Sequence, residues 1–394
     1  MSVPPAPVAA GAHDDLTDVA GVRVGHYDRR EGGWRTGTTV VLLPEGTIGG
    51  VDVRGGGPCT RETDALAPGT LVEQVHAICL SGGSVFGLAA AGGVTDWLAE
   101  QGRGLPVGPG PGEVAPIVPA ACLYDLRPGA WDRRPDAAFG RAAAEAAAGA
   151  GGAGPVALGS VGAGTGARAG GLVGGVGSAS TVLGGGVTVA ALAAVNAAGD
   201  PVDPAGGRLL GSDLLLPGEG AGEGADGAAG TAGGEARRPD GVGTGAAGSE
   251  RAGGEARPGP GGAARPAPGV EERPARGSTI LVVVATDAEL AQAECTRVAM
   301  AAHDGLARAV RPAHGLTDGD VVFAVATGAV PLDAGGGRRG LLRAGPARAA
   351  GLGAVMAAAA DAVTRSIVRG LLAAQGDAFL PSYLDRHPGR TPPS

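Results

Sequence analysis

The sequence predicts an α/β fold, because strand-like apolar runs alternate with helical segments over much of the chain. Residues 279–285 read Thr-Ile-Leu-Val-Val-Val-Ala. A run this apolar is typical of a strand that is buried on both faces. Residues 290–306 follow it with apolar side chains at a spacing of mostly three or four residues, which is typical of an amphipathic helix.

Shorter runs of the same two kinds fill the rest of the sequence. Apolar or β-branched runs that end at Gly, Pro or polar residues predict strands. The segment Ser-Gly-Gly-Ser at 81–84 predicts the start of a helix. In chain order, we expect a strand at 38–43, a strand at 77–80, a helix to about 101, strands at 187–195 and 321–326, and a helix at 351–374.

One segment departs from this alternation. After a few initial leucines, residues 206–276 consist almost entirely of Gly, Ala, Pro, Arg and Glu, with no aromatic residue. Such a composition cannot bury enough apolar surface to offset the entropy of ordering the chain. We therefore predict an ordered part at about 15–205 and a disordered segment at about 206–276. A structureless segment of this length is best explained as the free end of a chain that is cut nearby.

Composition and charge exclude several classes of function. The 394-residue chain has a formal net charge of −8, and its 31 basic residues are all arginine. Nucleic acids and anionic membranes bind dense basic surfaces, which this sequence lacks, so we expect neither as a partner. The N-terminus has no signal-peptide pattern. The apolar segment 351–374 carries Asp361, Arg365 and Arg369, which disfavours a membrane span. We expect a cytoplasmic protein.

Common cofactor motifs fail on specific residues. Residues 162–167 match G-x-G-x-x-A, but no acidic residue follows at the distance that a dinucleotide site needs. A phosphate-binding loop needs a lysine, and the sequence has none. The cysteines form no CxxC pair and the histidines have no metal-ligand spacing, so His76, His303 and His314 are predicted to be structural. We expect no cofactor and no metal.

The junction at 276–280, Arg-Gly-Ser-Thr-Ile, places two hydroxyl side chains between the polar segment and the buried strand. A hydroxyl at this point can attack the carbonyl that precedes it, and water can then resolve the ester. The product has a new N-terminal hydroxyl residue, whose α-amine has an ordinary pKa near 7.7–8.0 and can accept the proton of its own hydroxyl. A plain linker that meets a strand explains the same residues.

Several segments outside 206–276 carry a specific pattern: LTDVAGVRVGH at 16–26, LSGGSVFGL at 80–88, IVPAACLYDL at 117–126, GSVGAGTGA at 159–167, GGVGSAS at 174–180, VVVATDA at 282–288, AHDGLA at 302–307 and DGDVVFA at 318–324. Together they resemble the L-aminopeptidase/D-esterase (DmpA-type) family, which includes β-peptidyl aminopeptidases and the nylon-oligomer endohydrolase. The resemblance implies an αββα sandwich similar to that of N-terminal-nucleophile hydrolases. It also implies self-cleavage into α and β subunits and a homo-oligomer, a tetramer of αβ units.

The same resemblance implies where the chain is cut. The family nucleophile lies six residues before the first Ala of the segment 285–288, which gives Thr279. The cut would then separate Ser278 from Thr279 and leave an α subunit of residues 1–278 and a β subunit of residues 279–394. Ser278 as nucleophile, with a cut after Gly277, remains an alternative.

Four more site residues follow from the resemblance. Asp318 and Asp320 match paired polar family positions, and one of these carboxylates would hold the ammonium or hydroxyl of the threonine. Asn196 and Tyr124 match the residues that would donate hydrogen bonds to a developing oxyanion. The alternatives are a solvent-exposed Asp-Gly-Asp turn, a turn asparagine and a half-buried core tyrosine.

One position departs from the family pattern. A lysine usually precedes the segment 174–180, and here the residue is Val173. Arg168 lies nearby in the sequence but stays protonated and is a poor base. The expected activity is hydrolysis of small peptides, amino acid amides or esters, or amide oligomers. The alternatives are an acyltransferase of the ornithine acetyltransferase kind and a catalytically impaired family member with a binding or structural role.

Overall fold

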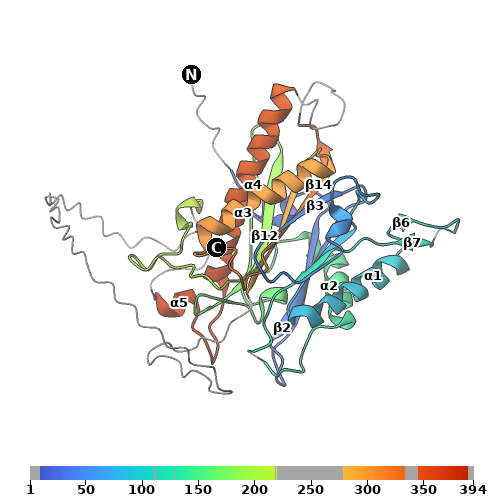
Figure 1. The fold of residues 1–394 in the computed structure, drawn as a ribbon. Coiled ribbons are helices and arrows are strands. Elements are labelled where there is room, and N and C mark those ends of the chain that lie inside the picture. The colour runs from blue at the N-terminus through green and yellow to red at the C-terminus, as the bar shows by residue number, and fades with distance from the viewer. Residues whose placement is uncertain are drawn as a thin grey trace, which may run out of the picture. The chain divides into compact units, whose positions relative to one another are not determined.

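In the computed structural model, the chain is described over residues 9–110, 112–127, 129–217, 219, 278–332 and 345–388. The described residues before 220 and after 277 belong to one compact unit. Two five-stranded sheets stack within this unit, and helices cover the outer face of each sheet (Figure 1). The layers therefore follow the order helices, sheet, sheet, helices, which confirms the predicted αββα sandwich.

The first sheet is built around the strand that begins at Thr279, which the sequence predicts. Its spatial order is β11 (Gly175–Val182), β12 (Thr188–Asn196), β13 (Thr279–Ala288), β14 (Val321–Val330) and β3 (Ile48–Val53). All neighbouring strands in it are antiparallel except β13 and β14, which are parallel. β13 is the middle strand and is buried along almost its whole length, as its continuous apolar run predicts.

The second sheet is shorter and faces the first. Its spatial order is β1 (Arg23–Arg29), β2 (Thr36–Leu42), β5 (Ala77–Ser81), β8 (Ala120–Cys122) and β4 (Thr60–Arg61). Of the neighbouring pairs in this sheet, β5 and β8 are parallel and the others are antiparallel. Two small ribbons complete the strands: β9 (Arg168–Ala169) with β10 (Leu172–Val173), and β6 (Leu105–Pro106) with β7 (Val114–Ala115).

Helices cover the two outer faces. α3 (Gln292–Ala309) and α4 (Pro346–Ala373) pack on the first sheet, and α1 (Ala90–Glu100) and α2 (Ala137–Ala148) lie against the second. A short helix, α5 (Tyr383–Arg386), follows α4. Short 3-10 helices occupy Leu16–Asp18, Asp64–Leu66, Ser84–Ala89, Ala150–Ala153, Gly162–Gly164 and Ser212–Leu214.

The helix predicted after residues 81–84 begins differently from the expectation. The chain first makes a 3-10 helix, Ser84–Ala89, and only then enters α1. Gly83 and Ser84 both have positive φ angles, 83° and 53°. This left-handed pair turns the chain sharply after β5, so a regular α-helix cannot begin at Ser84.

Side chains of β13 alternate between two apolar layers. Ile280, Val282 and Val284 pack in the layer between the first sheet and helices α3 and α4. Leu281 and Val283 point the other way, into the layer between the two sheets. Because both faces of β13 are covered by protein, its residues must be apolar on both. The buried strand fixes where its first residue, Thr279, lies.

α4 is long and apolar enough to cross a membrane by length and composition alone. However, 61% of its most apolar window is buried inside the protein, where it packs on β11 and β12. Its charged residues have protein partners: Arg308 pairs with Asp361, and carboxylates pair with Arg365 and Arg369. We conclude that α4 is a core helix, as the charged residues within it predict.

Ordered structure extends beyond both predicted boundaries of the first part. Ala9 pairs with Val182 before residue 15, and Leu209 is buried in the core after residue 205. The early leucines of the segment 206–276 pack, because a local apolar cluster matters more than the average composition of a long segment. Residues 220–277, the bulk of the segment predicted to be disordered, lie outside the described residues.

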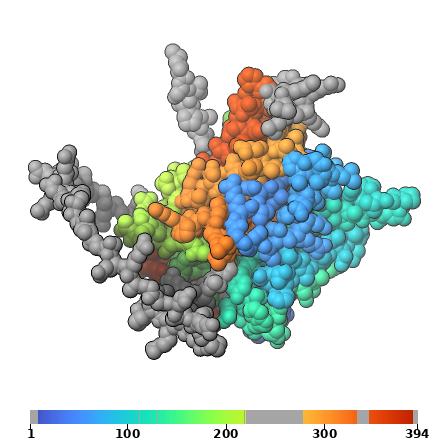
Figure 2. All heavy atoms as spheres, viewed as in Figure 1, coloured from blue at the N-terminus to red at the C-terminus, as the bar shows by residue number. Residues whose placement is uncertain are grey.

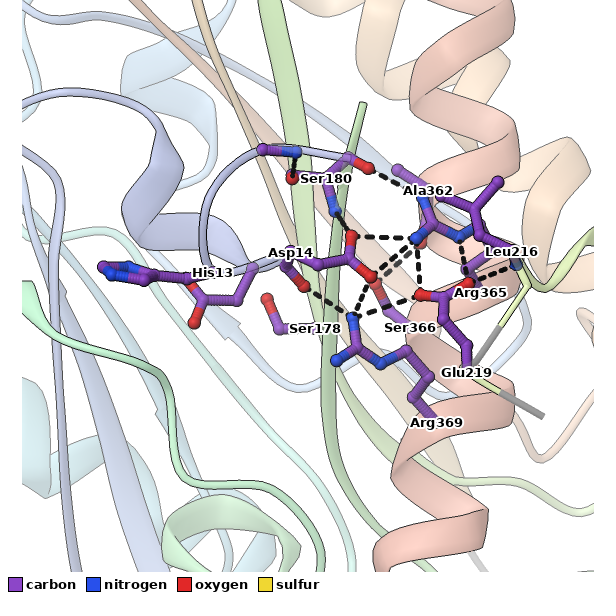
Figure 3. Close-up of polar contacts among 12 residues, drawn as sticks. His13, Asp14, Ser178, Ser180, Leu216, Glu219, Ala362, Arg365, Ser366 and Arg369 are labelled. Carbon is purple, nitrogen blue, oxygen red and sulfur yellow. Dashed lines mark hydrogen bonds and ion pairs between the residues drawn. The ribbon is translucent and has the colours of Figure 1, made fainter. Parts of the chain in front are cut away.

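A buried charge network joins both ends of this first part to α4 (Figure 3). Asp14 precedes β1, and Glu219 lies at the end of the described residues before 278. Arg365 Nη2 lies 2.7 Å from Asp14 Oδ2 and 2.5 Å from Glu219 Oε1. Arg369 Nη1 lies 2.7 Å from the same Asp14 oxygen. Burial and the neighbouring Glu219 carboxyl raise the pKa of Asp14 to about 7, against the attraction of the two arginines.

The network predicts a large loss of stability when one cation is removed. Arg365→Met would leave Asp14 and Glu219 close together with one guanidinium fewer, and we expect the free energy of unfolding to fall by about 3–5 kcal/mol. The matched control is Arg308→Met, because the Arg308–Asp361 pair is about half exposed (47% and 48%) and should contribute at most about 1 kcal/mol. Urea unfolding of both variants measures the difference. Equal losses would contradict this view of the network.

Candidate active site

Thr279 is the first residue of β13 and is buried. It lies directly opposite Asn196, the last residue of β12, in the strand register. Alternate side chains of a strand share a face, and Leu281 and Val283 point into the layer between the sheets. The Thr279 side chain is therefore on the strand face that looks toward the second sheet.

The peptide bond between Ser278 and Thr279 is held by two hydrogen bonds to one oxygen. Thr279 Oγ1 donates to the Ser278 carbonyl oxygen at 2.6 Å. The Gly319 N–H donates to the same oxygen at 2.9 Å. The hydroxyl thus lies beside the carbonyl that self-cleavage would attack. The Gly319 N–H meets the oxygen on which negative charge would develop.

The middle residue of Asp318-Gly319-Asp320 is held by close backbone packing. A Cβ atom at Gly319 would lie 2.4 Å from the carbonyl oxygen of Gly57, a distance at which neither backbone can remain in place. Gly57 in turn donates its N–H to the Asp318 carbonyl at 2.8 Å. Figure 2 shows blue atoms of the N-terminal part of the chain next to orange atoms of the part after residue 278 on the face in view. The alternative of a solvent-exposed Asp-Gly-Asp turn is wrong, because Asp318 and Asp320 are both buried.

The two aspartates occupy different environments. Asp320 Oδ1 accepts from the N–H of Ile280 at 2.8 Å, so this carboxylate anchors the main chain directly after Thr279. Asp318 Oδ2 accepts from the N–H of Gly315 at 2.7 Å. Asp318 Oδ1 is buried and has no hydrogen-bond partner among the described residues. Asp318 is therefore the carboxylate with an oxygen left to accept a new donor.

Asn196 is oriented by main-chain groups on both sides of its amide. The N–H of Arg168 donates to Asn196 Oδ1 at 2.9 Å, which directs the amide nitrogen away from β9. Asn196 Nδ2 donates to the carbonyl oxygen of Tyr124 at 3.3 Å. The structure thus brings Asn196 and Tyr124 together beside Thr279, although Tyr124 meets Asn196 through its main chain.

The residue after Tyr124 fixes the loop that carries it. Asp125 is buried, and its Oδ1 accepts from the N–H of Gly83 at 2.6 Å. Burial raises the pKa of Asp125 to about 6, while the Gly83 N–H acts in the opposite direction. This bond ties the Tyr124 loop to the sharp turn after β5.

The residue at the position of the family lysine has an apolar side chain with buried surroundings. Val173 lies in β10, opposite Arg168, and its side chain is buried. This position therefore supplies no amine that could accept a proton.

His314, which the sequence predicts to be structural, lies beside the candidate site. Its Nδ1 lies 2.7 Å from Asp320 Oδ2. Its ring packs edge-on against His303, with 4.8 Å between the ring centroids, and burial lowers the pKa of His303 to about 4. No spacing in the sequence indicates that His314 contacts Asp320, because the two side chains come together only when the loop before β14 folds. Among the described residues, no group of three or more His, Cys, Asp or Glu side chains could hold a metal ion.

Comparison with curated proteins finds relatives that span nearly the whole chain. An uncharacterized aminopeptidase of Mycobacterium tuberculosis (strain ATCC 25618 / H37Rv) is 44% identical over 382 residues, which cover 95% of this chain and 98% of that protein. A 6-aminohexanoate-oligomer endohydrolase of Paenarthrobacter ureafaciens is 31% identical over 334 residues, which cover 83% of this chain and 79% of that protein.

Solved structures share the fold. A β-aminopeptidase of Burkholderia sp. superposes with a TM-score of 0.62 at 25% identity and covers 97% of this chain and 94% of its own. The L-aminopeptidase D-Ala-esterase/amidase of Ochrobactrum anthropi has a TM-score of 0.60 at 20% identity, with 97% of this chain and 93% of its own covered. That structure is described as a new variant among the Ntn hydrolase fold.

The model of peptidase family S58 matches residues 14–378, a span that includes both sheets and every candidate site residue. The chain belongs to peptidase family S58 and is a hydrolase of peptide or amide bonds.

Proposed function

We propose that this protein cuts its own chain between Ser278 and Thr279 and then hydrolyses amide bonds with Thr279 as an N-terminal nucleophile. One observation carries the proposal: the Thr279 hydroxyl and the Gly319 N–H both lie on the Ser278 carbonyl oxygen, at 2.6 Å and 2.9 Å. The hydroxyl therefore lies at the carbonyl group that it would attack, and a donor is ready for the charge that forms on the oxygen.

Self-cleavage needs no external group except water. Thr279 Oγ1 bonds to the Ser278 carbonyl carbon, and the C–N bond between the two residues breaks. The hydroxyl proton passes to the nitrogen, which becomes the α-amine of Thr279. Water then attacks the ester, which releases the carboxyl group of Ser278 and regenerates the hydroxyl. The contact of Thr279 Oγ1 with the Ser278 carbonyl oxygen favours Thr279 as the nucleophile, and Ser278, with a cut after Gly277, is the alternative.

After self-cleavage, groups at the same site act in the hydrolysis of substrates. The α-amine of Thr279 accepts the proton of its hydroxyl as that hydroxyl attacks a substrate carbonyl. Asp318, through its unpartnered oxygen, holds the ammonium form, while Asp320 fixes the strand behind the nucleophile. The amide of Asn196 donates to the oxyanion, and the phenol of Tyr124 is the second donor. Because Val173 offers no amine, the Thr279 amine is the base.

The substrates that fit this chemistry are small amides. The names of the relatives include aminopeptidases, a β-aminopeptidase and a 6-aminohexanoate-oligomer endohydrolase. We propose small peptides, amino acid amides or esters, and amide oligomers as substrates of this chain. An assay with an added amine acceptor separates hydrolysis from acyl transfer. A cytoplasmic location and a homo-oligomer, a tetramer of αβ units, belong to the same proposal.

A catalytically impaired protein is the second candidate, and the buried Val173 favours it. If the missing lysine is essential to the chemistry, the purified chain will stay intact and will not turn over amides. A binding or structural role would then remain.

The nucleophile is tested by removing each hydroxyl in turn. Thr279→Ala should leave a single uncut chain without amidase activity, because both the attack and the later turnover use this hydroxyl. Ser278→Ala should still be cut, and mass spectrometry should show a smaller fragment that begins at Thr279. Thr279→Ser keeps a hydroxyl and should retain cleavage. A smaller fragment that begins at Ser278, or turnover by intact Thr279→Ala, would refute the assignment.

Asn196→Asp tests the oxyanion donor with little change in shape. The aspartate keeps an oxygen to accept the Arg168 N–H but loses both amide N–H groups and adds a negative charge. We expect kcat to fall about 10²- to 10³-fold with a smaller change in KM. Steady-state kinetics on a chromogenic amino acid amide give both constants. A kcat within a few-fold of the wild type would remove Asn196 from the proposed mechanism.

A further inference from the structure

His314 is held in a backbone conformation that few residue types adopt. It lies between α3 and β14 with a φ angle of 57°, one of four non-glycine residues with positive φ in the described chain. The left-handed region is uncommon for residues with a Cβ atom, and Asn, Asp and His adopt it more often than the other types. The backbone strain of such a residue is offset by the contacts that surround it.

The contacts at His314 converge on Asp320. The imidazole Nδ1 lies 2.7 Å from Asp320 Oδ2, and the backbone N–H of His314 donates to the same oxygen at 3.2 Å. The other carboxylate oxygen, Oδ1, accepts from the N–H of Ile280 at 2.8 Å. Asp320 therefore forms a direct bridge between the loop at His314 and the residue bonded to Thr279.

The surroundings of the ring leave it little freedom. His303 is fully buried and packs edge-on against it, and His303 Nε2 lies 3.1 Å from the Asp52 carbonyl oxygen. Arg54 donates its N–H to the Asp320 carbonyl at 2.8 Å and its Nε to Asp52. His314 Nε2 is buried and has no hydrogen-bond partner among the described residues. The Nδ1 atom thus makes the ring's polar contact, and it makes it to Asp320.

We propose that His314 is a positioning residue for the nucleophile. It holds the Asp320 carboxylate so that Oδ1 fixes the Ile280 N–H, and through this N–H it sets the start of β13 relative to Gly319 and Asn196. This inference rests on the proposed role of Thr279. It adds a residue that touches neither substrate nor the reacting atoms and that acts through Asp320.

The position of Thr279 decides the rate of both reactions. Self-cleavage needs the hydroxyl at its own preceding carbonyl, and turnover needs it between the Asn196 amide and the substrate. A displacement of about 1 Å at a reacting group can reduce a rate by about 100-fold. Loss of the His314 contact should therefore lower kcat and the rate of self-cleavage together, and it should leave KM nearly unchanged.

Two substitutions separate this role from a purely structural one. His314→Gly removes the ring and accepts the positive φ angle without strain. His314→Asn also tolerates this angle, and its amide nitrogen occupies nearly the place of imidazole Nδ1. We expect the Gly variant to lose about 10- to 100-fold in kcat and the Asn variant to recover most of that loss. The measurements are kcat and KM on a chromogenic amino acid amide, the rate of self-cleavage on gels, and Tm.

The comparison has clear failing outcomes. A Gly variant with normal kcat, or an Asn variant as slow as the Gly variant, would overturn the proposal. If the Gly variant does not fold, the Asn variant is compared with His314→Gln. The glutamine side chain is one methylene longer, so its amide lies beyond the Nδ1 position. Equal kcat for the Gln and Asn variants would overturn the proposal. Thr279→Ala is included throughout. If that variant is still cut or still turns over amides, the proposed function fails, whatever the His314 variants show.

Discussion

The register of β13 between β12 and β14 is the constraint on which the candidate site depends. Antiparallel pairing with β12 places Thr279 opposite Asn196, and the parallel approach of β14 places Gly319 on the Ser278 carbonyl. A shift of one residue would turn the Thr279 side chain to the opposite face of the sheet, away from Asn196 and Tyr124. The shift would also break the hydrogen bonds of the Ile280 N–H to Asp320 and of the Gly319 N–H to the Ser278 carbonyl, which hold the start of β13 in place. The core of the protein and its chemistry are thus fixed by the same strand.

Much of the fold could be predicted because its strongest signals are local. The run 279–285 and the periodic segment after 290 are long and regular, and both became the expected element types. Ordered structure continues past the predicted end at about 205, because Leu209 and Glu219 are buried, although the average composition of the Gly- and Ala-rich segment predicts disorder. The layer order came from resemblance, since the pairing of strands far apart in the sequence has no local signature.

The site could be predicted in part, for a related reason. Family motif positions predict Thr279, Asn196, Tyr124 and the two aspartates as site residues, and the structure places their main chains around the start of β13. The different environments of Asp318 and Asp320 could not be predicted from the sequence, because they depend on N–H groups of His314, Gly315 and Ile280 that only the folded chain brings to the two carboxylates. The contact of His314 with Asp320 could not be predicted for the same reason, because no spacing in the sequence indicates it.

The charge network at α4 has a consequence for the proposed cut. Asp14 and Glu219 precede Thr279 in the chain, whereas Arg365 and Arg369 follow it, so the buried ion pairs cross the point of cleavage without depending on its peptide bond. Strand pairing between β12 and β13 crosses it as well. Backbone scission would therefore relax only the immediate surroundings of Ser278. The two cleaved polypeptides would stay associated in one folded unit. They would separate on unfolding and not on dilution.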